Sequence, residues 1–372
     1  MKQFHIYFIS LVFILLAFIS CKEVTPDDEE EAEFMVGGDI SLLDKINDFG
    51  GTYQVNGIQK DALEIFKDNG YNYARLRLFH TPNMEGATVQ DLAYTLKLAK
   101  RIKAADLKLL LNFHYSDTWA DPGKQYKPSA WEDLSFEELS DSVYHYTLYV
   151  MNAFAKAGIT PDMVQPGNEV SHGMIWPDGK LDGDTEFQKA KKWDQFVQLI
   201  NAGINGIRDS QEGSGIPVMI HIANGGEVNT TRWFFDNLIS RGVQFEVIGQ
   251  SYYPWWHGTI EMLEENINFM IETYRKDVVL VETAYQWKGQ YPDDADYSHY
   301  QPYPLTEQGQ FDFLQRLYDI CQQYPKVTGL FYWYPESIET TPEAQLRYFD
   351  RSLFREDGEA LPGIASWNST DN

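Results

Sequence analysis

Basic residues are scarce in this 372-residue chain: 30 Lys and Arg stand against 55 Asp and Glu, a formal net charge of -25. A surface with this charge repels the phosphate backbone of DNA and RNA, so we expect no nucleic-acid partner. Cysteine is rarer still, with only Cys21 and Cys321 present. One of them lies in the amino-terminal segment described below, so the chain has no disulfide framework to staple a fold.

Several catalytic and nucleotide-binding motifs are missing. No GxGxxG or GxxxxGK follows a strand-like segment, which disfavours a nucleotide-binding sheet. The eight histidines include no HExxH pair, so a catalytic metal lacks its usual ligands. No GxSxG elbow is present, which leaves serine-hydrolase chemistry without a nucleophile. Chemistry that depends on a nucleotide, a catalytic metal or an activated serine is therefore not indicated.

The amino-terminal segment has the pattern of an export signal. Residues 4–19 are almost wholly apolar, which is short for a bilayer span of roughly 20 residues and typical of a signal-peptide core. The cysteine in Ser20-Cys21 resembles that of a bacterial lipobox, and the acidic run that follows resembles the surface-export signal of Bacteroidetes lipoproteins. We therefore expect a lipoprotein signal peptide over 1–20, acylation of Cys21 into outer-membrane lipid, and an acidic tether over 21–33. Display on the bacterial cell surface is favoured, and a periplasmic or secreted protein is the alternative.

From residue 34 onward, β-rich segments alternate with amphipathic helical segments. Eight such β-rich runs occur, spaced roughly 30 to 55 residues apart, which implies parallel strands joined by crossover helices. Eight units of this kind predict a single (β/α)8 TIM barrel over 34–372, with a doubly wound open sheet as the alternative. The predicted strands are 34–37, 73–79, 107–114, 163–167, 217–223, 245–251, 278–282 and 327–333. The predicted helices include 89–105, 135–157, 185–210, 260–274 and 306–324.

Polar and aromatic residues stand at the carboxyl ends of these strands, where a TIM barrel places its active site. In the second strand, period-two alternation puts Tyr73, Arg75, Arg77 and Phe79 on one face. If that face is the barrel interior, Arg77 lies near the top. Any single polar residue at such a position is more often structural, but together they predict a ring around one mouth. The other strand-end residues are Asn112, His114, Asn168, Glu169, His221, Asn224, Glu282 and Trp333.

Glu169 and Glu282 end the fourth and seventh predicted strands and form a candidate catalytic pair. Cleavage of a glycosidic bond needs one carboxylic acid to protonate the leaving oxygen and a second carboxylate to attack or stabilise the sugar carbon. Glu282 follows an apolar run, so its ionised form requires a partner, and Arg77 is the predicted one. We expect this guanidinium to lower the pKa of Glu282 and less favourable surroundings to raise the pKa of Glu169.

Longer motifs give a resemblance to a known family. In chain order they are FHYSDTWADPG (113–123), VQPGNEVSHGMIWP (164–177), HIANG (221–225), SYYP (251–254), VET (281–283) and GLFYWYP (329–335). They resemble glycoside hydrolase family 53, the endo-β-1,4-galactanases of clan A, over about 35–367. The resemblance implies retaining, endo-acting hydrolysis of β-1,4-galactan and type I arabinogalactan, with release of galacto-oligosaccharides and no cofactor needed for the chemistry.

The resemblance also implies roles for individual residues. Glu169 becomes the acid/base and Glu282 the nucleophile, with Arg77 holding the latter. A supporting set of residues surrounds this pair: Asn168, bonding the sugar 2-hydroxyl; His114 and His221, bridging as donors; Tyr253, favoured over Tyr252 because it precedes a proline; Trp333, forming the floor of the cleavage subsite; Trp119, lying nearby; and Asn224 and Asp117. Core packing is the alternative role for both tryptophans.

The loop after the seventh strand carries alternating acidic residues. Asp294 and Asp296 are oxygen ligands of the kind that hard cations favour, and some bacterial members of the family carry calcium in this loop. A solvated acidic turn is an equally good interpretation of the same residues.

Two other functions stay open at the level of the sequence. The first is a clan A endo-glycanase that cuts another β-1,4-polysaccharide, such as mannan, xylan or β-glucan. The second is a glycan-binding surface lipoprotein without catalysis, which the aromatic content of 15% would suit. In either case we expect a monomer.

Overall fold

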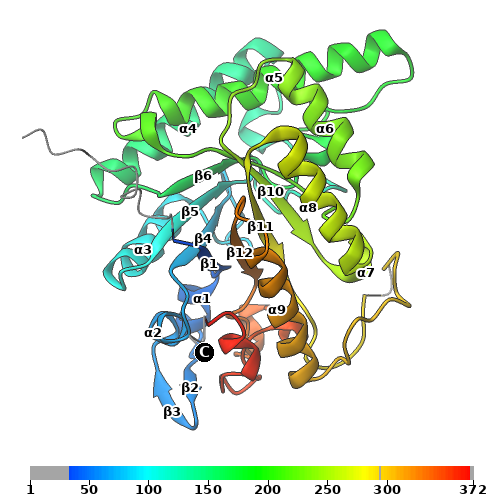
Figure 1. Cartoon of the computed structure of the whole chain (residues 1–372). Helices are drawn as coiled ribbons and strands as arrows, with labels where there is room; N and C mark the ends of the chain where they lie inside the picture. The colour runs from blue at the N-terminus through cyan, green and yellow to red at the C-terminus, as the bar shows by residue number, and fades with distance from the viewer. Residues whose placement is uncertain (1–32, 293–294, 369–372) are drawn as a thin grey trace, which may run out of the picture. The chain divides into compact units, whose positions relative to one another are not determined.

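The computed structural model describes residues 33–292 and 295–368, and the chain from Phe34 onward forms one compact unit. Eight parallel strands follow one another in the order β6-β5-β4-β1-β12-β11-β10-β9. A bridge between Val164 in β6 and Val218, just before β9, links the two ends of this order. The helices surround the strands (Figure 1). The prediction of a (β/α)8 barrel is confirmed.

Each predicted strand overlaps one strand of the barrel. The barrel strands are β1 (Met35–Asp39), β4 (Tyr73–Leu78), β5 (Lys108–Phe113), β6 (Met163–Pro166), β9 (Met219–Ile222), β10 (Val247–Tyr252), β11 (Asp277–Thr283) and β12 (Val327–Trp333). Two small hairpins stand outside this sheet: β2 (Tyr53–Val55) with β3 (Ile58–Lys60), and β7 (Gly173–Met174) with β8 (Gly179–Lys180).

The helices begin where the sequence supplies a capping side chain. Ser135 and Glu138 form a capping box at the start of α4, and Thr185 and Gln188 do so at α5. Each box satisfies two of the backbone N–H groups left free at a helix start. None of the described helices is long and apolar enough to cross a membrane. The helices are α1 (Leu43–Asp48), α2 (Ala62–Asp68), α3 (Leu92–Ala104), α4 (Phe136–Lys156), α5 (Glu186–Arg208), α6 (Val228–Ser240), α7 (Pro254–His257), α8 (Ile260–Tyr274) and α9 (Glu307–Gln322).

The alternation of side chains along each strand builds two packed regions. In β5, Leu110 points into the barrel, whereas Leu109 and Leu111 pack against the helices outside it. This separation follows from the period of two in a strand. The interior is filled by large apolar side chains, which leave the polar strand ends at the mouth: Met35, Tyr73, Leu110, Met163, Met219, Val247, Val279, Val281 and Phe331.

Candidate active site

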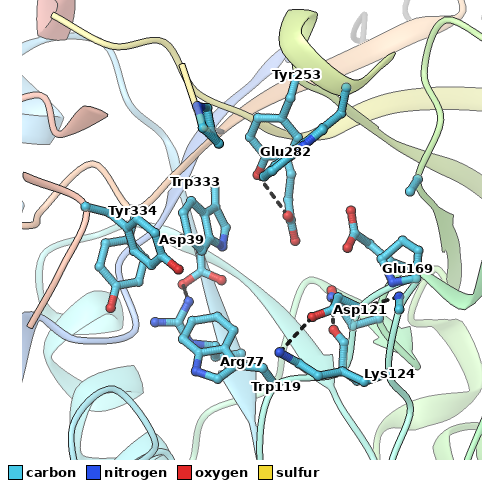
Figure 2. Close-up of a pocket in the computed structure, with 18 of the residues that line it drawn as sticks. Asp39, Arg77, Trp119, Asp121, Lys124, Glu169, Tyr253, Glu282, Trp333 and Tyr334 are labelled. Carbon is cyan, nitrogen blue, oxygen red and sulfur yellow. Dashed lines mark hydrogen bonds and ion pairs between the residues drawn. The ribbon is translucent and has the colours of Figure 1, made fainter. Parts of the chain in front are cut away.

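A cleft of about 890 Å³ opens at the carboxyl ends of the barrel strands. Its size suits a binding site for a small molecule or a short stretch of polymer. Figure 2 shows Glu169 and Glu282 pointing toward one another across it, with Trp333 and Tyr334 forming a wall to one side. The predicted site residues that line the cleft are Arg77, His114, Trp119, Asn168, Glu169, Asn224, Tyr253, Glu282, Asp296 and Trp333.

Glu282 lies near the end of β11, 5% exposed, and is held by two donors. Arg75 Nη1 donates to Oε1 at 2.6 Å, and the Tyr253 hydroxyl donates to Oε2 at 3.1 Å. The hydroxyl of Tyr252 donates instead to the carbonyl oxygen of Gly258. Of these two tyrosines, Tyr253 therefore contacts Glu282, and its role toward a ligand stays a prediction.

The prediction that Arg77 holds Glu282 is wrong, because Arg75 takes that role. Arg75 and Arg77 share one face of β4, and Arg75 lies level with Asp39, one pleat below Arg77. From that depth a long arginine side chain reaches the rim. Arg77 starts at the rim, so its guanidinium lies against aromatic rings, 4.2 Å from the centroid of Trp119.

Asp39, at the end of β1, completes a buried charge network that the sequence analysis missed. Its two carboxylate oxygens pair with Arg75 Nη1 at 3.3 Å and with Arg77 Nη1 at 3.1 Å. Asp39 and Glu282 thus balance the two arginines, as buried charges require. The predicted first strand stopped at residue 37, so Asp39 was not placed at the barrel mouth.

Glu169 follows β6 in an uncommon backbone conformation. Its φ of 45° and ψ of 52° are left-handed, which costs a residue with a side chain on the order of 1–3 kcal/mol. The Ser251 hydroxyl, from β10, donates to Glu169 Oε1 at 2.7 Å. The surrounding structure therefore holds both the backbone and the carboxyl group of Glu169.

The two carboxyl groups have different electrostatic surroundings. Burial raises the pKa of Glu169 to about 8, and the nearby Glu282 charge adds to the rise, as predicted. Burial also raises the pKa of Glu282, and the Arg75 guanidinium opposes that rise. The predicted lowering of the Glu282 pKa is wrong, because burial outweighs the cation. Among the described residues, Arg75 forms an ion pair with Glu282, and none forms one with Glu169.

Asn168 and His114 support the rim between these groups. Asn168 Oδ1 accepts from Arg75 Nη2 at 2.8 Å, and its Nδ2 donates to the carbonyl oxygen of Ala120 at 2.9 Å. An amide nitrogen carries two hydrogens, so one N–H of Asn168 remains for a ligand, and its bond to a sugar 2-hydroxyl stays a prediction. His114 Nδ1 accepts from the Ala120 N–H at 3.0 Å. That ring nitrogen is therefore an acceptor, which leaves the imidazole hydrogen on Nε2, and the predicted role of His114 as a donor stays a prediction.

The two tryptophans face the cleft. Both are partly exposed and line the cavity. Their ring centroids are 6.0 Å apart at an angle of 64°, and Trp333 also lies 4.7 Å from Tyr334. Both rings also pack against the edge of the hydrophobic core, so they line the cleft and pack against the core at the same time.

Two predicted site residues lie away from the cleft lining. His221 is fully buried behind Glu169, accepts from the Glu169 backbone N–H, and reaches the Glu169 carboxyl group through Ser251. Asp117 accepts from the backbone N–H groups of Thr81 and Ser129. It therefore fastens one loop to another instead of contacting a ligand directly.

The calcium prediction stays untested at its main residue. Asp294 lies outside the described residues, and Asp296 lines the cleft. Within the described ranges, no three His, Cys, Asp or Glu side chains gather as a metal site would require.

Three supporting residues besides Asp39 were missed, and each had a weak signal in the sequence. Arg75 lies on the same strand face as Arg77, so alternation named both arginines without showing which one contacts Glu282. Ser251 is the first residue of the SYYP motif (251–254). Gln165 lies in the VQPGNEVSHGMIWP motif (164–177), two residues before Gly167. Their contacts join strands far apart in the sequence, which no local pattern shows.

Comparisons with known proteins agree with this geometry. The model of glycosyl hydrolase family 53 matches residues 35–367. A Niallia circulans protein described as uncharacterized is 39% identical over 84% of this chain and 87% of its own. The arabinogalactan endo-beta-1,4-galactanase of Humicola insolens is 33% identical over 84% of this chain and 91% of its own. Among solved structures, the GH53 catalytic domain of Ignisphaera aggregans has a TM-score of 0.81 at 34% identity, covering 90% of this chain and 96% of that one. The chain belongs to glycosyl hydrolase family 53.

Proposed function

We propose that this protein hydrolyses β-1,4-galactosidic bonds within galactan and type I arabinogalactan, with retention of anomeric configuration, releasing galacto-oligosaccharides. The observation that carries the proposal is the pair of facing glutamates, of which Glu282 alone pairs with a cation. The name of the Humicola insolens relative supports galactan as the polymer.

In this proposal each carboxyl group has one role. Protonated Glu169 gives its proton to the leaving glycosidic oxygen while Glu282 forms a bond to the anomeric carbon. Glu169, now ionised, then takes a proton from water, whose oxygen displaces Glu282 from that carbon. The two carboxyl groups supply both the proton and the electron pair, so the steps need no cofactor. Trp333 and Trp119 offer ring faces to the apolar C–H surface of galactose.

Purified linear galactan, mannan, xylan and β-glucan test the choice of polymer. We expect new reducing ends from galactan and none from the other three. Proton NMR should show that the first product has the β configuration at its anomeric carbon. An α product would contradict retention, which requires carboxyl groups roughly 5 to 5.5 Å apart.

The variant Glu282→Ala separates an enzyme from a glycan-binding protein. We expect it to stop the release of reducing ends while binding to insoluble galactan persists, because the cleft's aromatic wall is unchanged. Wild-type protein that binds galactan and releases no sugar would establish the binding protein instead.

We also propose that the protein is a monomer anchored by acylated Cys21 at the bacterial cell surface. The support is the sequence of residues 1–31, since Cys21 lies outside the described residues. In a bacterium that processes lipoproteins, we expect Cys21→Ala to abolish labelling by a fatty-acid analogue. The matched control is Cys321→Ala, because Cys321 is buried beside the barrel and its loss should leave labelling intact. Labelling that survives Cys21→Ala would contradict the anchor.

A structural calcium ion in the loop after β11 remains part of the proposal. Its support is the family resemblance together with Asp294 and Asp296. Calcium-dependent protection of this loop from proteolysis would support the site, and equal cleavage with calcium or with chelator would contradict it.

A further inference from the structure

Glu169, His221 and Ser251 form a closed ring of hydrogen bonds. Its backbone N–H donates to His221 Nδ1 at 3.3 Å, His221 Nε2 lies 2.8 Å from Ser251 Oγ, and Ser251 Oγ donates to Glu169 Oε1 at 2.7 Å. One imidazole is thus connected to the backbone and, through one hydroxyl, to the side chain of the same glutamate. All three residues are buried.

The direction of every bond in this ring follows from one backbone group. A backbone N–H can only donate, so His221 Nδ1 is an acceptor, and Gln165 Nε2 donates to the same atom at 2.9 Å. The imidazole proton therefore lies on Nε2 and points to Ser251 Oγ. Burial holds the pKa of His221 well below its usual range, with the Arg75 charge adding to the effect, so the ring stays neutral. The hydroxyl hydrogen of Ser251 is left for Glu169.

We propose that Ser251 is a positioning residue that assigns the catalytic proton of Glu169 to Oε2. This inference rests on the proposed function. Because Oε1 accepts from Ser251, the protonated carboxyl group carries its hydrogen on the other oxygen, which is free to face the cleft. After that proton is given to the leaving group, the same hydroxyl stabilises the carboxylate that must accept a proton from water.

Other charged groups also act on Glu169, and they set the background for the test. Glu282 faces it from β11, and the Asp121 carboxylate on the loop after β5 adds negative charge, while Arg75 on β4 opposes both. Asp121 is itself paired with Lys124 at 3.1 Å. None of these groups changes when the Ser251 hydroxyl is removed.

The test is the pH dependence of galactan hydrolysis by Ser251→Ala. Loss of a donor to the ionised carboxylate disfavours ionisation, so the pKa of Glu169 should rise. The basic limb of kcat/KM should then move to higher pH by about one unit. Ser251→Thr keeps the hydroxyl and should restore the wild-type limb, even if its extra methyl lowers stability. Thr283→Val is the matched control, because this buried hydroxyl has no hydrogen-bond partner among the residues that the structure describes.

A limb that stays in place in Ser251→Ala, or one that moves equally in Ser251→Thr, would overturn the inference. Carbon-13 NMR titration of the Glu169 carboxyl, assigned by its absence in Glu169→Gln, measures the same pKa without a substrate. If the wild-type protein leaves galactan intact, the proposed function fails. The NMR titration still decides whether Ser251 stabilises the ionised carboxyl group.

Discussion

At the scale of single residues, Arg75 and Arg77 show how depth in a barrel separates two identical side chains. Arg75 donates hydrogen bonds to Glu282 and to Asn168, the residue before Glu169. Arg77 pairs with Asp39 and lies against Trp119 and Tyr334. Glu282 loses its cation when Arg75 is removed, whereas removal of Arg77 leaves Asp39 with Arg75 as its remaining partner.

We therefore predict that Arg75→Met and Arg77→Met affect the pH profile differently. Glu282 must be ionised to attack, and removal of the Arg75 guanidinium should raise its pKa further. The acidic limb of kcat/KM should consequently move to higher pH in Arg75→Met. Arg77→Met is the comparison, with an acidic limb near that of the wild type. Equal displacement of the acidic limb in both variants would show that the two arginines stabilise the Glu282 carboxylate equally, which would contradict the prediction.

At the scale of elements, the β7–β8 hairpin follows Glu169 after a single short turn, so its geometry bears on the catalytic backbone. Gly173 has a φ of 87°, and a Cβ at this position would lie 1.9 Å from the carbonyl oxygen of Gly179 in the opposite strand. Gly158, after α4, has a φ of 70° and nothing within 4 Å of the corresponding point. The two glycines share the backbone requirement and differ in the space beside them.

We predict that Gly173→Ala is more damaging than Gly158→Ala. Both pay the strain of a positive φ, about 1–3 kcal/mol, and only Gly173→Ala must also push the hairpin strands apart. Urea unfolding should show the larger loss of stability for Gly173→Ala, and its kcat should fall as Glu169 is displaced. Equal losses of stability in the two variants would show that the β7–β8 hairpin accommodates the extra methyl group at no energetic cost.

At the scale of the whole molecule, the mouth of the barrel contains buried acidic groups whose burial makes the fold more stable at low pH. Glu336, just after β12, is fully buried and accepts from the Leu42 N–H at 2.9 Å. Burial raises its pKa from 4.5 to about 8, and the charge of Asp39 adds to the rise. A pKa raised by folding gives stability that is complete below pH 4.5 and is lost as the pH rises through 8.

Glu336→Gln should therefore stabilise the protein increasingly between pH 5 and pH 8. The amide oxygen keeps the bond from Leu42, and the group no longer ionises. The gain should be on the order of a few kcal/mol at pH 8 and small at pH 4. Thermal unfolding at a series of pH values measures it, with exposed Glu64→Gln as the control. A gain that does not change with pH would contradict the buried titration.

The barrel could be predicted from the sequence, because strand and helix periods are local properties and recur along the chain. The pair Glu169 and Glu282 could be predicted too, since both lie at or just after predicted strand ends and a barrel brings all strand ends to one mouth. The motifs around them further separated Tyr253 from Tyr252.

How these groups are held became visible only in the folded chain. Whether Arg75 or Arg77 reaches Glu282 depends on depth in the barrel, which alternation cannot give because both residues have the same face. Asp39 and Ser251 act through contacts with strands far away in the sequence. The pKa of Glu282 depends on the balance between burial and one cation, and the sequence alone does not show how deeply a strand end is buried.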